Sequence, residues 1–215
     1  MFILGYIVVA IAAYLLGSIP TGFLVAKARG IDIRAVGSGN IGAANTFRSI
    51  GKTAGIFVLV IDALKGFVAV EACGMILKCL GIAETDVEDH YRIVAGISAI
   101  LGHNYTCWLK FKGGKGVATT AGVYLALAPA ALGIAVVVFI LVVAIWRYTS
   151  LGSMLAAVAL TIAVWFTRPD MCLRLVTIAL CLLTLLKHRT NIQRLAAGKE
   201  NKIEFKKKPA GGGNT

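Results

Sequence analysis

The sequence predicts an all-α polytopic membrane protein with seven transmembrane helices, its N-terminus outside and its C-terminus in the cytoplasm. Three observations support this prediction. Of the 215 residues, 58% are hydrophobic, and the mean hydropathy of +0.83 lies outside the range of soluble domains. Apolar runs long enough to cross about 30 Å of hydrocarbon are separated by short polar segments. The net charge is +12, and most Lys and Arg residues gather on one side of the predicted spans.

Each predicted span is an apolar run bounded by polar or helix-breaking residues. The first run ends in a segment where Gly17, Pro20 and Gly22 are expected to break or kink the helix. The run 117–146 is too long for one comfortable span, and Pro129 divides it into a short helix and a longer one. The predicted spans are residues 2–25, 54–77, 93–109, the two halves of 117–146, 151–167 and 171–186.

The distribution of basic residues tests this assignment. With the N-terminus outside, seventeen Lys and Arg residues lie inside and four outside, and the remaining one, Lys65, lies within a span. This asymmetry is the usual sign of the cytoplasmic side. A five-span alternative, in which 117–146 and 151–186 each cross once, also keeps the basic tail inside. It moves Ser150 and Ser153 outside, and we prefer seven spans.

The chain is expected to form one integral-membrane domain over residues 1–204, followed by a disordered, basic and glycine-rich tail over 205–215. The five cysteines are odd in number, lie mostly in apolar segments and form no metal-type pair, so we expect neither a disulfide framework nor a metal site. Asp62 and Lys65 are three residues apart inside an apolar run. Charges at that depth normally face the protein interior and pair with each other.

A glycine-rich segment, residues 37–48, lies between the first two long apolar runs and contains no acidic residue. Glycine lets the backbone turn its N–H groups inward, which suits an anion. The glycines also match the spacing of a dinucleotide-binding fingerprint, but that motif needs a βαβ unit, and its acidic residue would be Asp62 inside an apolar run. A flexible loop without function remains the alternative. The polar side chains of the segment include Ser38, Asn40, Asn45 and Arg48.

A second glycine-rich loop, residues 113–116, holds Lys115 directly before a helical apolar run. This arrangement is expected to aim free backbone N–H groups and the positive end of a helix dipole at an anion. The loop is not a Walker A motif, because Leu109 stands where the first glycine is needed and Gly116 where Ser or Thr would bind magnesium. As an alternative, Lys112 and Lys115 serve only to fix the topology.

The C-terminal segment contributes a third polar cluster. On a helix, His188, Asn191 and Leu195 fall on one stripe. The predicted orientation places them on the cytoplasmic face together with both glycine-rich loops and with Ser150 and Ser153 in a polar break. His103, near the end of the third apolar run, is expected to brace a neighbouring loop.

The catalytic groups that are missing narrow the reaction class. The predicted cytoplasmic clusters contain no His–carboxylate pair, no paired carboxylates for two metals and no Cys–His or Gly-x-Ser-x-Gly nucleophile. Hydrogen-bond donors that bind two anionic reactants suffice only if one reactant is already activated. A transporter for a phosphorylated small molecule and a scaffold for anionic lipids remain alternatives. The hydropathy argues against nucleic acid as the partner of the basic residues.

Three motifs resemble those of a known family: Ser38-Gly-Asn-Ile-Gly-Ala-Ala-Asn45-x-x-Arg48, Gly102-His103 followed by Phe111-x-Gly-Gly-Lys115-Gly-Val-Ala-Thr119, and His188-x-x-Asn191-Ile-x-Arg194-Leu. The chain is similar, from about residue 5 to 204, to the bacterial acyl-phosphate-dependent glycerol-3-phosphate acyltransferases (PlsY). Two positions depart from the pattern. Ala44 replaces a usual threonine, and Lys187 replaces a usual arginine, which keeps the charge but loses bidentate geometry.

The resemblance implies a seven-helix enzyme of the bacterial inner membrane whose active site faces the cytoplasm. It would transfer a fatty acyl group from acyl phosphate, not acyl-CoA, to the 1-hydroxyl of sn-glycerol 3-phosphate, yielding 1-acyl-glycerol 3-phosphate and phosphate in phospholipid synthesis. The lipid bilayer would be its setting, with no nucleic acid, metal or other cofactor.

The family motifs also imply roles for individual residues. Asn40 and Asn45 would shape the first loop near the substrate. Glycerol 3-phosphate would be held by Ser38, Arg48, Lys115, His188 and Asn191. The acyl-phosphate head would be held by Gly113, Gly114, Gly116, Ser150 and Ser153.

Overall fold

The computed structural model describes residues 2–82 and 88–203, and these residues form helices, turns and loops without a β-strand. The residues predicted as a tail, 205–215, lie outside the described part, as do residues 83–87 of the acidic loop. The helices are α1 (Phe2–Ser18), α2 (Thr21–Lys27), α3 (Ala43–Ser49), α4 (Lys52–Cys79), α5 (Glu88–Asn104), the 3₁₀ turn η1 (Cys107–Leu109), α6 (Val117–Leu127), α7 (Pro129–Trp146), α8 (Thr149–Thr167), α9 (Met171–Lys187) and α10 (Arg189–Ala196).

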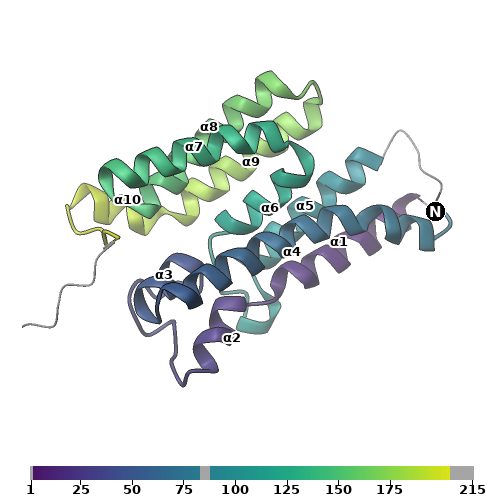
Figure 1. The fold of residues 1–215 in the computed structure, drawn as a ribbon. Helices are drawn as coiled ribbons and strands as arrows, with labels where there is room; N and C mark the ends of the chain where they lie inside the picture. Colours follow the sequence, from purple (N-terminus) through teal and green to yellow (C-terminus); the bar gives the residue numbers. More distant parts are fainter. Residues whose placement is uncertain (1, 83–87, 204–215) are drawn as a thin grey trace, which may run out of the picture.

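The long helices form two groups joined by a shorter helix (Figure 1). α1, α4 and α5 pack together in one group, α7, α8 and α9 form the other, and α6 lies against α4. The short helices α2, α3 and α10 lie at the end of the bundle opposite the chain's N-terminus, which we call the site end.

Small residues let the first group pack closely. A Cβ atom at Gly17 of α1 would collide with the backbone of Ala99 in α5, and one at Gly102 of α5 would collide with the carbonyl of Tyr14 in α1. Close approach of this kind is typical of helix pairs in membranes, where van der Waals packing replaces the hydrophobic effect as the driving force.

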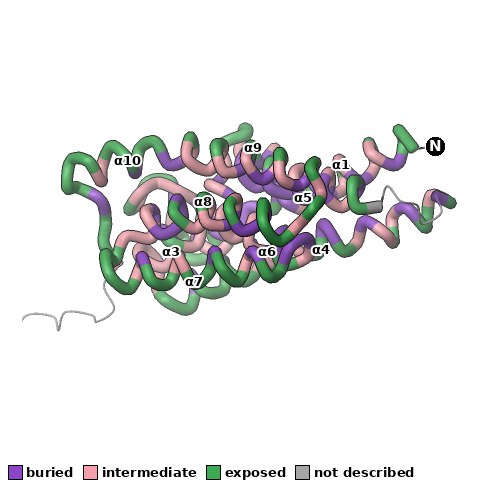
Figure 2. The backbone as a smooth tube through the Cα atoms, turned by 90° about the horizontal axis from the view of Figure 1, so that it is seen from above, coloured by how far each residue is buried: buried purple, intermediate pink, exposed green. Residues whose placement is uncertain are grey.

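Many residues on the outer faces of the bundle are exposed (Figure 2), and large apolar side chains are common among them. Ile7 of α1, Ile140 of α7 and Leu175 of α9 are each half exposed or more. A soluble monomer rarely exposes so much apolar surface, whereas lipid tails accept it. α7, α8 and the α1–α2 pair are long and apolar enough to cross a membrane, and α9 with α10, bent by 56°, makes a possible fourth span. The count of seven spans and the orientation stay predictions.

The helix breaks agree with the sequence where proline causes them. α1 ends two residues before Pro20, and α6 ends at Leu127, two residues before the Pro129 that begins α7.

Two other boundaries were predicted wrongly. α5 begins at Glu88 and ends at Asn104, several residues before the predicted limits. The predicted polar break around Ser150 and Ser153 is helical, because the turn is completed at Arg147 (φ 63°) and α8 already begins at Thr149.

Candidate active site

Two polar cavities and one apolar groove meet at the site end. The inner cavity has a volume of about 140 Å³, and the outer cavity, beside it, about 620 Å³. The apolar groove has about 430 Å³. The inner cavity brings together most of the residues singled out in the sequence: Ser38, Asn40, Asn45, Arg48, Lys115, Gly116, Ser150, Ser153, His188 and Asn191. Gly113 and Gly114 line the outer cavity instead.

The first glycine-rich loop is held in shape by Asn45, which is 1% exposed. Its amide Nδ2 donates to the carbonyls of Ile33, Val36 and Asn40 at 3.2, 3.1 and 2.9 Å, and its Oδ1 accepts from the Ser38 N–H at 2.9 Å. The Asn45 side chain is therefore fully engaged within the loop.

The Asn40 side chain also serves the loop, since its Oδ1 accepts from the N–H of Gly42 at 2.9 Å. Gly37 is required next to Asn45, because it has φ of 59° and a Cβ atom there would collide with the Asn45 amide. In the part of the chain that the structure describes, the side chains of Ser38 and Arg48 have no such internal bond.

Arg48, in α3, points a buried donor into this region without a partner. Its Nη1 is inaccessible to solvent and has no hydrogen-bond acceptor among the described residues. Burial lowers the pKa of Arg48, yet a guanidinium remains charged at neutral pH. A buried charge without a counterion is costly, and a bound anion removes the cost. Arg48 Nη1 is thus a donor that an anion in the inner cavity would satisfy.

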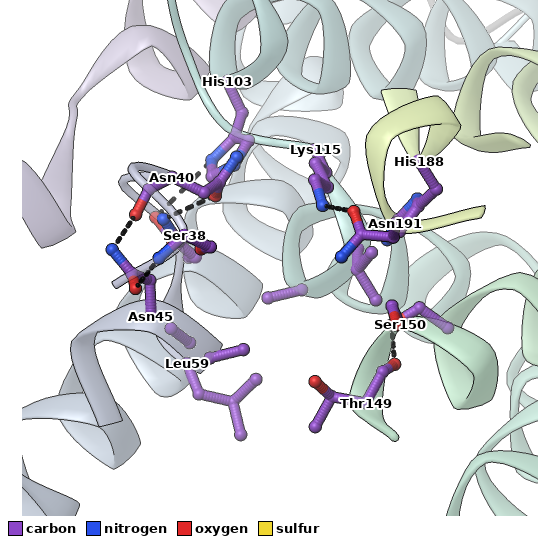
Figure 3. Close-up of a pocket in the computed structure, with 18 of the residues that line it drawn as sticks. Ser38, Asn40, Asn45, Leu59, His103, Lys115, Thr149, Ser150, His188 and Asn191 are labelled. Carbon is purple, nitrogen blue, oxygen red and sulfur yellow. Dashed lines mark hydrogen bonds and ion pairs between the residues drawn. The ribbon is translucent and has the colours of Figure 1, made fainter. Parts of the chain in front are cut away.

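Lys115, in the second loop, lines the same cavity and points toward Asn191 (Figure 3). Its Nζ donates to Oδ1 of Asn191. Burial, together with the nearby cations Arg194 and Arg48, lowers the pKa of Lys115 to about 8, while the charge of Glu200 opposes the shift. Arg48 and Lys115 line the same cavity, and a dianion would balance both of their charges.

Two of the three glycine amides of the second loop, those of Gly113 and Gly114, are not free, contrary to the expectation. Gly114 N–H donates to the carbonyl of His103 at 3.0 Å, and Gly113 N–H to that of Asn104 at 3.3 Å. Among the described residues, the amide of Gly116 and those of Val117 and Ala118 have no such acceptor. Val117 and Ala118 line the inner cavity in the first turn of α6, where N–H groups have no acceptor within the helix.

His188 offers an acceptor rather than a donor. Its Nδ1 lies 2.8 Å from the Thr184 carbonyl oxygen, which can only accept, so Nδ1 carries the proton and Nε2 carries a lone pair. Burial, together with the charge of Lys115, lowers the pKa of His188 to about 4. The neutral ring is suited to accept a hydrogen bond from a hydroxyl group.

Glu200 was missed in the sequence, where it lies in the basic tail. Its side chain is 2% exposed. Oε1 accepts from Ser150 Oγ at 3.0 Å and from Asn191 Nδ2 at 2.8 Å, and Oε2 accepts from Arg194 Nε at 2.9 Å. Burial would raise the pKa of Glu200, but these bonds hold it below its usual value. An acid within a basic segment was the available signal.

Both serines of α8 that line the inner cavity have their hydroxyl protons engaged within the protein. Ser150 donates to Glu200, and Ser153 Oγ donates to the Thr149 carbonyl at 2.8 Å. Both serines line the inner cavity through their remaining lone pairs and backbone.

A buried charged cluster adjoins the inner cavity, which Asp62 and His103 of the cluster also line. Lys65 Nζ lies 2.8 Å from Asp62 Oδ1, 2.9 Å from the Ile19 carbonyl and 2.9 Å from His103 Nδ1. Thr21 Oγ1 donates to Asp62 at 3.0 Å. An ammonium group has three N–H bonds and no lone pair, so each finds an acceptor here. The predicted Asp62–Lys65 pair is confirmed.

The same cluster fixes the tautomer of His103. Because Lys65 donates to Nδ1, the neutral ring carries its proton on Nε2. A Cβ atom at Gly114 would collide with Nε2, so this ring edge lies against the second glycine-rich loop. His103 also lines the inner cavity and braces that loop through its own carbonyl.

The apolar groove continues directly from the inner cavity between α4, α6, α7 and α8. Leu59, Val117, Ala118, Phe139 and Ser153 line both. The groove extends along α7 from Phe139 to Leu132, which is about 10 Å at 1.5 Å per residue. A ligand with an anionic head and an alkyl chain fits this combination. Among the described residues, no group of three or more His, Cys, Asp or Glu side chains forms a metal site.

Comparisons with known proteins agree with the geometry. The family model described as glycerol-3-phosphate acyltransferase matches residues 7–198. A glycerol-3-phosphate acyltransferase of Geobacter metallireducens is 52% identical, and one of Trichlorobacter lovleyi 46%, each over 192 residues, 89% of this chain and 94% of the relative.

Two solved structures of PlsY (YgiH), an integral membrane glycerol 3-phosphate acyltransferase, share the fold. The glycerol 3-phosphate form has a TM-score of 0.83 at 35% identity and covers 93% of this chain and 96% of its own. The lysophosphatidic acid form has a TM-score of 0.80 at 34% identity, with 93% and 95% covered.

Proposed function

Because the chain belongs to the glycerol-3-phosphate acyltransferase family, we propose that it transfers a fatty acyl group from acyl phosphate to the 1-hydroxyl of sn-glycerol 3-phosphate. The products are 1-acyl-glycerol 3-phosphate and inorganic phosphate. The observation that carries the proposal is the unpartnered, buried Nη1 of Arg48 beside Lys115, in a cavity that opens into an apolar groove. The site thus offers cations for phosphate and a groove for an acyl chain.

The proposed setting is the bacterial inner membrane, crossed seven times, with the site end in the cytoplasm. The excess of Lys and Arg in the segments of the site end supports this orientation. Glycerol 3-phosphate is water-soluble and reaches a site at the membrane surface, while the acyl donor stays in lipid.

The acyl donor would lie across the inner cavity and the groove. An extended chain of single bonds advances about 1.2 Å per bond, as an extended polypeptide does. The groove length of about 10 Å therefore accommodates roughly eight methylene groups, and the rest of a long chain extends into the bilayer. The mixed anhydride head would sit near Val117 and Ala118, whose free amides face developing negative charge on the carbonyl oxygen.

Arg48, Lys115 and Ser38 would hold the phosphate of the acceptor, and His188 Nε2 would accept a hydrogen bond from its hydroxyl group. The hydroxyl oxygen attacks the acyl carbon, the C–O bond of the ester forms, and the anhydride C–O bond breaks. Inorganic phosphate leaves with the electron pair. Alignment of two bound reactants supplies much of the acceleration when the donor is already activated.

A substrate phosphate is the better proton acceptor in this site. Glu200 and Asp62 are both neutralised by bonded donors. Burial holds the pKa of His188 at about 4. The second pKa of a phosphate monoester is about 6, so its dianion is a stronger base than His188. We assign the hydroxyl proton to a substrate phosphate and a positioning role to His188.

A turnover assay tests the proposal. Purified protein receives acyl phosphate and labelled glycerol 3-phosphate, and both lysophosphatidate and phosphate are measured. We expect equal amounts of the two products with acyl phosphate and none with acyl-CoA. A folded sample without turnover contradicts the proposal, and use of acyl-CoA contradicts the donor assignment. Uptake of labelled substrate into sealed vesicles without product formation indicates a transporter instead.

A further inference from the structure

The outer cavity is larger than the inner cavity and carries more charge. Its four cationic lining residues are Lys115, Lys187, Arg189 and Arg194, and no carboxylate stands among its described lining. The inner cavity, at about 140 Å³, is smaller than ordinary ligand pockets, which have ~300 Å³ or more. The outer cavity gives an anion additional space directly next to the inner cavity.

Three of the four cations are already engaged. Arg194 bonds to Glu200 at 2.9 Å, Lys115 bonds to Asn191, and Lys187 donates to the Asn104 carbonyl at 3.0 Å and lies over the Tyr105 ring. Arg189, at the start of α10, is exposed and makes no hydrogen bond or ion pair within the described residues. Arg189 is thus available to meet an anion arriving from solution.

The two cavities meet at a short polar boundary. Ser38, Asn40 and Lys115 line both of them. The apolar groove joins the inner cavity from the side of α7 and α8, through Phe139 and Ser153. A water-soluble anion and a lipid therefore have separate routes to the same place.

We propose that the outer cavity is a capture site for phosphate monoesters, through which the acceptor reaches the inner cavity and inorganic phosphate leaves. Arg189 makes the first contact, and the anion then passes Ser38 and Asn40 to Lys115 and Arg48. This inference rests on the proposed function for the identity of the anion. A cleft lined by one sign of charge raises the local concentration and association rate of an oppositely charged ligand.

The test compares Arg189→Gln with Lys112→Gln, which removes the same charge from an exposed position in the loop next to Lys115 but outside both cavities. At low ionic strength we expect Arg189→Gln to lower kcat/KM for glycerol 3-phosphate by about 5- to 10-fold with kcat unchanged within twofold. The difference shrinks as salt screens the charge. Lys112→Gln keeps the wild-type kcat/KM.

A binding measurement separates this inference from the proposed function. Calorimetric titration with inorganic phosphate needs no turnover, and Arg189→Gln is expected to raise the Kd severalfold while Lys112→Gln leaves it unchanged. Equal effects of the two substitutions, or an unchanged kcat/KM and Kd in Arg189→Gln, overturn the capture site. If the wild-type protein shows no turnover but Arg189→Gln still raises the Kd for phosphate, the proposed reaction is overturned and the anion site is supported.

Discussion

Two polar regions adjoin each other at the inner cavity, which Asp62 and His103 also line, and they use their charges in opposite ways. In the Asp62–Lys65–His103 cluster, each ammonium proton has an acceptor, and the carboxylate also accepts from Thr21. In the inner cavity, Arg48 Nη1 is buried without an acceptor. The first region is complete without a ligand, and the second is not.

This difference separates structural from functional polarity. Buried polar groups that satisfy one another fix a unique packing, whereas a buried charge held open costs stability and is retained where a ligand completes it. The first cluster ties the end of α1 to α4 and α5 through Ile19, Asp62 and His103. It thereby holds the framework on which the open charges of the second region stand.

The largest expected effect comes from breaking the closed cluster. Asp62→Asn leaves the Lys65 ammonium buried without its counterion, and removal of one partner of a buried pair costs about 3–5 kcal/mol of unfolding free energy. Reversible unfolding in detergent measures the loss. The double variant Asp62→Asn, Lys65→Met removes both charges and is expected to recover most of the stability. A single variant as stable as wild type contradicts the comparison.

In the open region, removal of a charge is expected to lower activity rather than stability. Arg48→Ala is expected to lower kcat/KM by about 10²- to 10³-fold, the range for loss of one charge-stabilising group, with no loss of unfolding free energy. Arg34→Ala is the control, because Arg34 forms an exposed ion pair with Asp32 at 2.9 Å and such pairs contribute little. Near-normal turnover in Arg48→Ala removes this residue from the site. A large loss of stability assigns it to the framework instead.

The sequence predicts the features that depend on local chemistry. Pro20 and Pro129 interrupt helices wherever the rest of the chain lies, and the three-residue spacing of Asp62 and Lys65 places both on one helix face. The grouping of the glycine-rich loops with His188 and Asn191 follows from topology, which hydropathy and charge reveal.

Other features depend on tertiary contacts and are not visible in the sequence. The acceptors for the Gly113 and Gly114 amides come from the end of α5. Glu200 acquires its partners only when the chain after α10 turns back, with Ile203 N–H donating to the Arg147 carbonyl at 2.8 Å. The role of Ser150 changes with it, from a free hydroxyl to a donor for Glu200.

His103 belongs to both regions, and two substitutions separate its two edges. Asn places an acceptor near the position of Nδ1 and preserves the bond from Lys65, while Gln places an N–H donor near the position of Nε2. We expect His103→Asn to keep the unfolding free energy and to lower kcat/KM, because it removes the Nε2 edge that lies against Gly114 at the inner cavity. His103→Gln is expected to show the opposite. If both variants lose stability alike and neither loses activity selectively, His103 serves the closed cluster alone.

The smallest expected effect is a fall in kcat/KM at alkaline pH, which reports the protonation of Lys115 in the open region. Lys115 must be protonated to bind phosphate, and burial lowers its pKa to about 8, so the protonated fraction falls as pH rises through that value. A single group with this pKa gives a loss of about fivefold in kcat/KM between pH 8 and pH 9. The second pKa of the substrate phosphate is about 6, so the phosphate contributes nothing to this fall in kcat/KM.

Lys115→Arg is the control, because arginine keeps its charge at all these pH values. We expect kcat/KM of this variant to stay constant between pH 8 and pH 9, even if its value at pH 7 is lower. A fall in kcat/KM that persists in Lys115→Arg belongs to another group, and the open charge would then rest on Arg48 alone.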